Sequence, residues 1–174
     1  LFVGRLVPHK GIGILIRSLT YTQRGKLLII GDGPYKNWLV NLVKKLDLND
    51  RVIFVGPVDD YWLPSYYSAT DVVVLPSTSR LEAFGIVGLE GMATAKPLIL
   101  SDIPGVRDVI SEKEGYIVEP LDPSAIAEAL EKIWNAPEMA REMGLRGRER
   151  VEKLFSWEKV SKDVESVFKN ILSK

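Results

Sequence analysis

Two acids, Glu82 and Glu90, frame the sequence LEAFGIVGLE and enclose an aromatic residue and a glycine, Phe84 and Gly85. Three glycines fall within what reads as one helix beginning near Phe84. Each glycine in a helix interior costs about 1 kcal/mol relative to alanine. A stretch that gives up helix stability in this way is typical of a place where the backbone approaches a ligand.

The chemistry that suits this stretch is recognition of a phosphate group that carries a sugar. A helix N-terminus leaves unpaired backbone N–H groups and a partial positive charge, which together favour bound anions. Gly85 removes the side chain at the position where a diphosphate would touch the backbone. One of the two carboxylates, Glu82 or Glu90, could then hold a ribose diol, while the other accepts hydrogen bonds from the hydroxyls of a second sugar.

Other chemistries for two carboxylates fit this stretch less well. Glycosidases also pair two acids across a sugar, but those acids usually come from different elements. A metal site needs more oxygen ligands than the stretch offers, so we expect no metal. The plain alternative is that both acids face solvent, which the glycines and the apolar character of the helix disfavour.

Two cations, Arg5 and Lys10, lie in the first strand–helix junction, VGRLVPHKGIGIL. In open α/β sheets ligands bind beyond the carboxyl ends of the strands, where this junction lies. Arg5 could hold a phosphate through a bidentate fork and Lys10 as a point charge. Two unrelated surface cations are the alternative. The junction glycines, Gly4 included, match neither the P-loop nor the dinucleotide-binding spacing.

A second glycine pair, Gly31 and Gly33, follows the second apolar run in the sequence GDGPYK. We interpret this sequence first as a tight turn into a helix that carries Pro34 near its start. The glycines would also let a ligand approach the backbone.

Apolar runs that alternate with helical patterns predict the α/β class: a three-layer, Rossmann-like domain with a mostly parallel six-stranded sheet. The predicted strands are 1–5, 26–31, 51–56, 71–77, 96–101 and 115–120. The predicted helices are 11–19, 33–46, 59–69, 84–95, 122–135, 137–150 and 157–172. No linker or repeat interrupts the pattern, so we expect a single domain over residues 1–174.

The last predicted helix is amphipathic, with charged residues of both signs opposite an apolar face. A helix on a membrane surface would carry a mainly basic polar face. We therefore expect the apolar face to pack on the core, or in part on a partner domain. Its residues are Trp157, Val160, Val164, Val167, Phe168 and Ile171.

Composition excludes several classes of function. The 23 basic and 23 acidic residues cancel, which argues against binding of nucleic acid. No cysteine and one histidine exclude disulfides and disfavour a zinc site. No apolar run approaches the length of a membrane span and no signal peptide is visible, so we expect a cytoplasmic protein. The single glutamine and the many Lys, Arg and Glu residues faintly indicate a thermophile.

The stretch PSTSRLEAFGIVGLEGMATAKPLI resembles the nucleotide-sugar signature of retaining GT-B glycosyltransferases of family 4 type, which include glycogen synthase relatives. Four further segments resemble the family in the same order: VGRLVPHKGI, IIGDGP, VIFVGPV and GYIVEPLDPSAIAEAL. The resemblance implies the C-terminal, donor-binding half of a GT-B fold, with the N-terminal acceptor-binding domain absent. The abrupt start at LFVGRL, without a methionine, likewise leads us to expect a fragment.

The resemblance implies a role for individual residues. Arg5 and Lys10 match the pair that grips the donor diphosphate, and Glu82 matches the acid that contacts the donor sugar; these are the expected catalytic residues. Phe84 and Gly85 match backbone amides near the phosphates.

Further donor-binding positions also follow from the resemblance. Glu90 matches the acid that holds the ribose, and Val58 lies where the backbone contacts the base. Gly31 and Gly33 match a donor-side loop, and Gly4 completes the expected donor-binding set. Departures from the family pattern leave the identity of the donor sugar undetermined. They are Gly91 in place of alanine, Ala95 in place of glycine, and Ile103–Pro104 in place of a double glycine.

For the whole protein, the resemblance implies retaining transfer of a hexosyl group from a UDP-, ADP- or GDP-sugar, with no tightly bound cofactor. The acceptor would be held by the missing domain, so the isolated chain should turn over little or nothing. Peripheral membrane association of the full protein stays open. The alternatives are a nucleotide-sugar epimerase of the same fold and a non-enzymatic module that senses nucleotide sugars.

Overall fold

Six short parallel strands form the middle layer of the structure, a computed structural model that describes residues 1–111 and 113–172. The strands are β1 (Phe2–Val3), β2 (Leu27–Ile30), β3 (Val52–Gly56), β4 (Val73–Leu75), β5 (Leu98–Ser101) and β6 (Gly115–Val118). The α-helices are α1 (Ile12–Ser18), α2 (Lys36–Lys45), α3 (Leu63–Ser68), α4 (Ile86–Ala93), α5 (Pro123–Asn135), α6 (Pro137–Leu154) and α7 (Trp157–Leu172). Short 3-10 helices are η1 (Pro8–Lys10), η2 (Leu19–Tyr21) and η3 (Arg107–Val109).

The strands form two three-stranded parallel sheets, in the orders β1-β2-β3 and β4-β5-β6. The two sheets meet where β1 lies beside β4, and there the backbone N–H of Val74 donates to the carbonyl of Leu1 at 2.9 Å. We call this junction the seam. The spatial order of the strands is therefore 3-2-1-4-5-6. Strands β2 and β3 are added on one side of β1, and strands β4 to β6 are added on the other side, so the strand order reverses at the seam. The predicted α/β class with a parallel arrangement is confirmed.

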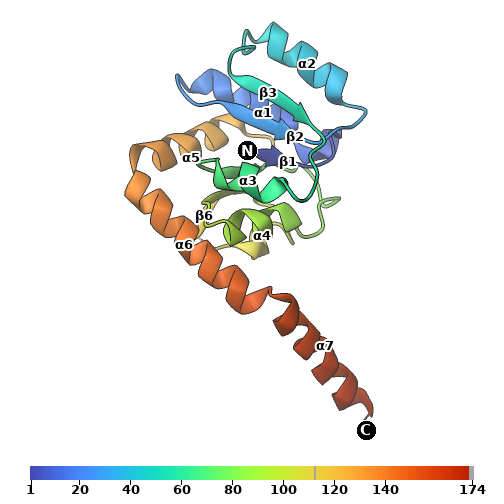
Figure 1. Ribbon diagram of the computed structural model, residues 1–174. Coiled ribbons are helices and arrows are strands. Elements are labelled where there is room, and N and C mark those ends of the chain that lie inside the picture. The colour runs from blue at the N-terminus through green and yellow to red at the C-terminus, as the bar shows by residue number, and fades with distance from the viewer. Residues whose placement is uncertain (112, 173–174) are drawn as a thin grey trace.

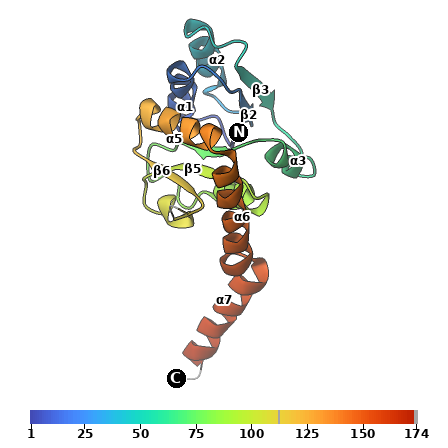
Figure 2. The ribbon, with the colours of Figure 1, turned by 90° about the vertical axis from the view of Figure 1, so that its left-hand side faces the viewer.

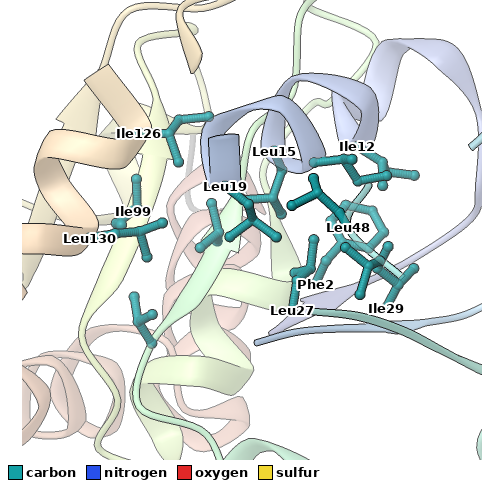
Figure 3. Packing of buried hydrophobic residues seen from close by; sticks show 14 of the residues in the cluster. Phe2, Ile12, Leu15, Leu19, Leu27, Ile29, Leu48, Ile99, Ile126 and Leu130 are labelled. Atoms are coloured by element: carbon teal, nitrogen blue, oxygen red, sulfur yellow. The ribbon is translucent and has the colours of Figure 1, made fainter. Parts of the chain in front are cut away.

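Helices cover both faces of the sheets, because neighbouring strand residues point to opposite sides. Val74 faces a core cluster formed with α1, α2 and α5, whereas Val73 and Leu75 face a second cluster formed with α3, α4 and α6. Figures 1 and 2 show the resulting three layers. Figure 3 shows side chains of α1 and α5, such as Leu15 and Ile126, lying over the strands.

Helix α4 begins at Ile86, two residues later than predicted, because Gly85 takes the left-handed conformation with φ of 77°. The N-cap glycine and one glycine within the helix also have a packing role. A Cβ on Gly85 would lie 2.7 Å from Leu75 Cδ2, and one on Gly91 would lie 2.8 Å from Leu98 Cδ2. Close packing of α4 on β4 and β5 therefore explains part of the glycine content that the sequence suggested was for a ligand.

Helix α7 projects away from the layered body, as both ribbon views show (Figures 1 and 2). None of its described residues is buried, and its apolar face is open, with Trp157 85% and Phe168 61% exposed. The expectation that this face packs on the core is therefore wrong for this chain. Helical periodicity shows that a face is apolar, but it does not show what covers that face.

Deleting residues 156–174 should leave the melting temperature within about 2 °C of that of the full chain, since α7 buries no side chain of its own. A thermal melt followed by circular dichroism measures this. A loss of more than about 5 °C, roughly 1–2 kcal/mol for a chain of this size, would show that α7 stabilises the layered body after all.

Candidate functional site at the carboxyl edge of the seam

Two loops meet where β1 and β4 end, at the point where the strand order reverses. One loop runs from Gly4 through η1, and the other runs from Ser77 to the start of α4. The amide of Thr78 in the second loop donates to the carbonyl of His9 in the first at 2.8 Å. In open α/β sheets this reversal point is the usual ligand site.

Lys10 and Glu82 come together across these loops, although 72 residues separate them in the sequence. Their ammonium and carboxylate groups form an ion pair, and their side chains are only 17% and 11% exposed. The hydroxyl of Ser77 lies 3.4 Å from the same carboxylate oxygen, Glu82 Oε2. An ammonium has three N–H donors, so Lys10 can hold Glu82 and still donate to a bound anion.

Arg5 lies in the first loop, but the structure does not place it in the ion pair. Its side chain is exposed and makes no hydrogen bond or ion pair with any part of the chain that the structure describes. The Arg5 guanidinium is thus free to reach a ligand at this edge. The Lys10 ammonium lies closer in, near Gly4.

The start of α4 adds backbone donors beside the ion pair. Within residues 1–111 and 113–172, the amides of Phe84, Gly85 and Ile86 donate to no group. The Phe84 ring packs edge-on against Phe155, with 5.8 Å between the ring centroids. The ring is therefore in contact with the end of α6, while the backbone amides of this segment keep their hydrogen-bonding capacity.

The glycine loops after β1 and β2 pack backbone against backbone. The Gly4 amide donates to the Ile30 carbonyl at 3.0 Å. Gly31 has φ of 123°, and a Cβ there would lie 2.0 Å from the Gly4 oxygen. A Cβ on Gly33 would lie 2.4 Å from the Leu6 oxygen. These glycines let the loops after β1 and β2 pack closely on each other, and this packing fixes the backbone at the carboxyl ends of the two strands.

Val58 and Glu90, the two other predicted donor contacts, come from the loop after β3 and from α4. Val58 follows the end of β3 and is partly buried against the second core cluster. Glu90, on α4, is partly exposed, and its Oε2 accepts a hydrogen bond of 2.5 Å from the hydroxyl of Tyr67 on α3. Burial, and then the hydrogen bond and negative charge of Glu90, raise the pKa of the Tyr67 phenol far above its usual value.

Two residues important to this geometry were not predicted from the sequence. Gly11, the N-cap of α1, has φ of 70°, and a Cβ there would lie 1.8 Å from the Pro76 carbonyl oxygen. It lets the first loop touch the end of β4. Tyr67 is the other. The glycines of KGIG could have drawn attention to Gly11, but nothing local in LPSYYS marks Tyr67.

Other surfaces of the molecule contain none of the predicted site residues. A cavity of about 450 Å³ lies at the amino ends of the strands, lined among others by Arg24, Lys96, Trp134 and Arg141. The described residues include no group of three or more side chains that could hold a metal ion. Among those residues, no helix has the length and apolar content needed to cross a membrane.

Comparison with known sequences identifies related proteins along the whole chain. Residues 1–150 match the family described as Glycosyl transferases group 1. An uncharacterised glycosyltransferase of Methanocaldococcus jannaschii is 34% identical, over 97% of this chain and 44% of its own length. A glycogen synthase of Mycobacterium tuberculosis is 31% identical, over 97% of this chain and 41% of its own length. The chain thus spans less than half the length of these relatives.

Solved structures share the same fold. Sucrose-phosphate synthase from Thermosynechococcus elongatus superposes with a TM-score of 0.90 at 35% identity, over 99% of this chain and 45% of that one. HepE from Anabaena, in complex with UDP-glucose, superposes with a TM-score of 0.89 at 22% identity, over 97% and 48% of the two chains.

Proposed function

The chain belongs to the group 1 family of glycosyl transferases, and on that premise we propose that it binds the nucleoside-diphosphate sugar donor of a retaining hexosyltransferase. The observation that carries this proposal is the contact of Lys10 with Glu82 across the seam, beside the free amides at the start of α4. A cation and open amides suit a diphosphate, and a carboxylate suits sugar hydroxyls. A distant structural relative, HepE, is known in complex with UDP-glucose, which supports the same ligand class.

In the proposed reaction the bond between the sugar C1 and the diphosphate oxygen breaks, and the nucleoside diphosphate leaves with the bonding electrons. The acceptor hydroxyl forms a new bond to C1 on the same face of the sugar and gives up its proton to the departing diphosphate oxygen. Arg5, Lys10 and the α4 amides place positive charge where the leaving group becomes more negative. Each hydrogen bond to a charged group contributes about 1.5–3 kcal/mol.

The remaining residues hold the donor in place. Lys10 engages Oε2 of Glu82, which leaves Oε1 for hydroxyls of the donor sugar. Glu90 would hold the ribose, and the backbone near Val58 would contact the base. Gly4, Gly31 and Gly33 would form the donor-side floor of this site. All of these proposed contacts are made by oxygen and nitrogen atoms of the chain itself.

The acceptor is proposed to bind to an N-terminal domain that this chain lacks, so the isolated chain should bind donor but transfer little or nothing. We further propose that the open apolar face of α7 packs in part against that missing domain. The cytoplasmic location and the thermophilic source also stay predictions.

Titration calorimetry with UDP, ADP, GDP and their glucose and mannose conjugates tests the donor site. We expect one base to be preferred and Glu90→Ala to weaken the best ligand at least tenfold, about 1.4 kcal/mol, because the ribose contact is lost. Glu128→Ala, which removes an exposed carboxylate on α5, is the matched control and should change the affinity less than twofold.

A folded chain that binds none of these ligands, or that binds equally well without Glu90, contradicts the donor-site proposal. The full-length protein separates the remaining alternatives. Transfer to an acceptor supports the transferase. Conversion of the donor into its epimer supports the epimerase. Binding without any turnover supports a sensing module.

A further inference from the structure

We propose that Tyr67 positions Glu90 for the ribose of the donor, a role that rests on the proposed function. Tyr67 lies on α3, outside the nucleotide-sugar stretch, 23 residues before Glu90. Its hydroxyl donates to Glu90 Oε2 at 2.5 Å. This is the one hydrogen bond that the Tyr67 hydroxyl makes within the described part of the chain.

The tyrosine is a rigid support for the carboxylate. Its side chain is 2% exposed and packs in the second core cluster with strand residues such as Val73 and Leu75. A buried hydroxyl needs a partner, and a bond to a carboxylate is stronger than one between neutral groups. Glu90 is therefore held in one orientation before any ligand arrives, which lowers the entropy lost on binding.

The hydrogen bond also divides the two carboxylate oxygens between two tasks. Oε2 accepts from the tyrosine, whereas Oε1 keeps both of its lone pairs to accept from ribose hydroxyls. Because burial and the neighbouring carboxylate raise the Tyr67 phenol pKa, the hydroxyl stays protonated and remains a donor at all ordinary pH values.

Helix α3 connects this support to the proposed base-binding side of the edge. The helix follows the loop that carries Val58, and Tyr67 lies in the last turn of the helix. α3 and α4 lie next to each other below the first three strands (Figure 1). Tyr67 thus connects α3, the helix after β3, to Glu90 on α4. The proposed contacts to the base and to the ribose are therefore held by elements that pack on each other.

Tyr67→Phe tests this role because it removes the hydroxyl and keeps the ring. Calorimetry would compare the tightest of UDP, ADP and GDP with its 2′,3′-dideoxy form, in which the ribose hydroxyls are absent. We expect Tyr67→Phe to weaken the ribose form about threefold to tenfold and the dideoxy form less than twofold. Tyr66→Phe is the matched control on the same helix, since Tyr66 makes no hydrogen bond within the described residues through its hydroxyl, and it should change neither affinity.

Glu90→Ala, run in parallel, distinguishes failure of the inference from failure of the proposed function. If Glu90→Ala removes the preference for the ribose form but Tyr67→Phe keeps it, the positioning role is overturned and the donor site stands. An equal loss for both ligands in Tyr67→Phe shows a merely structural role and overturns the inference as well. If the wild-type chain has no ribose preference, the ribose site itself fails and Tyr67 has nothing to position.

Discussion

Replacing Lys10 with alanine is expected to lower the affinity for the nucleoside diphosphate about 30-fold, which corresponds to roughly 2 kcal/mol. The ammonium is a charged donor in a mostly buried position between Gly4 and Glu82. Its removal takes away the phosphate contact and leaves the Glu82 carboxylate to repel the diphosphate. In the full-length enzyme kcat should fall further, about 10²–10³-fold, because the leaving group carries more charge in the transition state.

Calorimetry of the chain and initial rates of the full-length enzyme measure the two effects separately. Lys45→Ala is the control, since Lys45 is an exposed lysine in the last turn of α2. Lys10→Arg should recover part of the binding, because it restores the charge with a different geometry. An affinity of Lys10→Ala within twofold of wild type would contradict the assignment of Lys10 to the diphosphate.

Replacing Gly11 with alanine is expected to lower the free energy of unfolding by about 3 kcal/mol or more. The left-handed conformation at φ of 70° costs a non-glycine residue about 1–2 kcal/mol. The new Cβ would also lie 1.8 Å from the Pro76 carbonyl oxygen, which is backbone and cannot move aside alone. The first loop must shift as a unit, and the Lys10–Glu82 pair is expected to separate with it.

Gly56→Ala is a matched control for this prediction. Gly56 also has a positive φ, 85°, but a Cβ there would meet nothing within 4 Å. It should therefore show the conformational cost alone. Urea unfolding of both variants isolates the contribution of the loop contact. If Gly11→Ala lowers the free energy of unfolding no more than Gly56→Ala does, the close contact between the two loops does not stabilise the chain, and the prediction is wrong.

The strands were predictable because they are short, continuous apolar runs between polar or glycine-containing turns. All six observed strands lie inside the predicted ranges, and Asp122 caps α5 as predicted, accepting hydrogen bonds from the amides of Ser124 and Ala125. The position of the first loop at the carboxyl ends of the strands followed from the general rule for parallel sheets. These features depend on local sequence or on topology, and both can be read from one chain.

The features that were missed depend on three-dimensional neighbours. The start of α4 was placed two residues too early, because the local sequence does not show that Gly85 takes the left-handed conformation and lies close to Leu75. Tyr67 has no local signal, since its importance comes from a partner 23 residues away. The ion pair of Lys10 with Glu82 was not predicted either, since it joins residues 72 positions apart. The apolar face of α7 shows that periodicity cannot tell a buried face from an open one.

The seam has a consequence for the order of folding. Residues 1 and 74 pair across it over 73 positions, whereas the contact of Val73 with Leu98 inside the second sheet spans 25. Loop-closure entropy rises only with the logarithm of length, so the seam costs about 1 kcal/mol more to close than such a neighbouring pair. The strand pairs within each three-stranded sheet are therefore cheaper to close than the pair at the seam. The proposed donor site depends on the more costly contact, because Lys10 follows β1 and Glu82 follows β4 on the two sides of the seam.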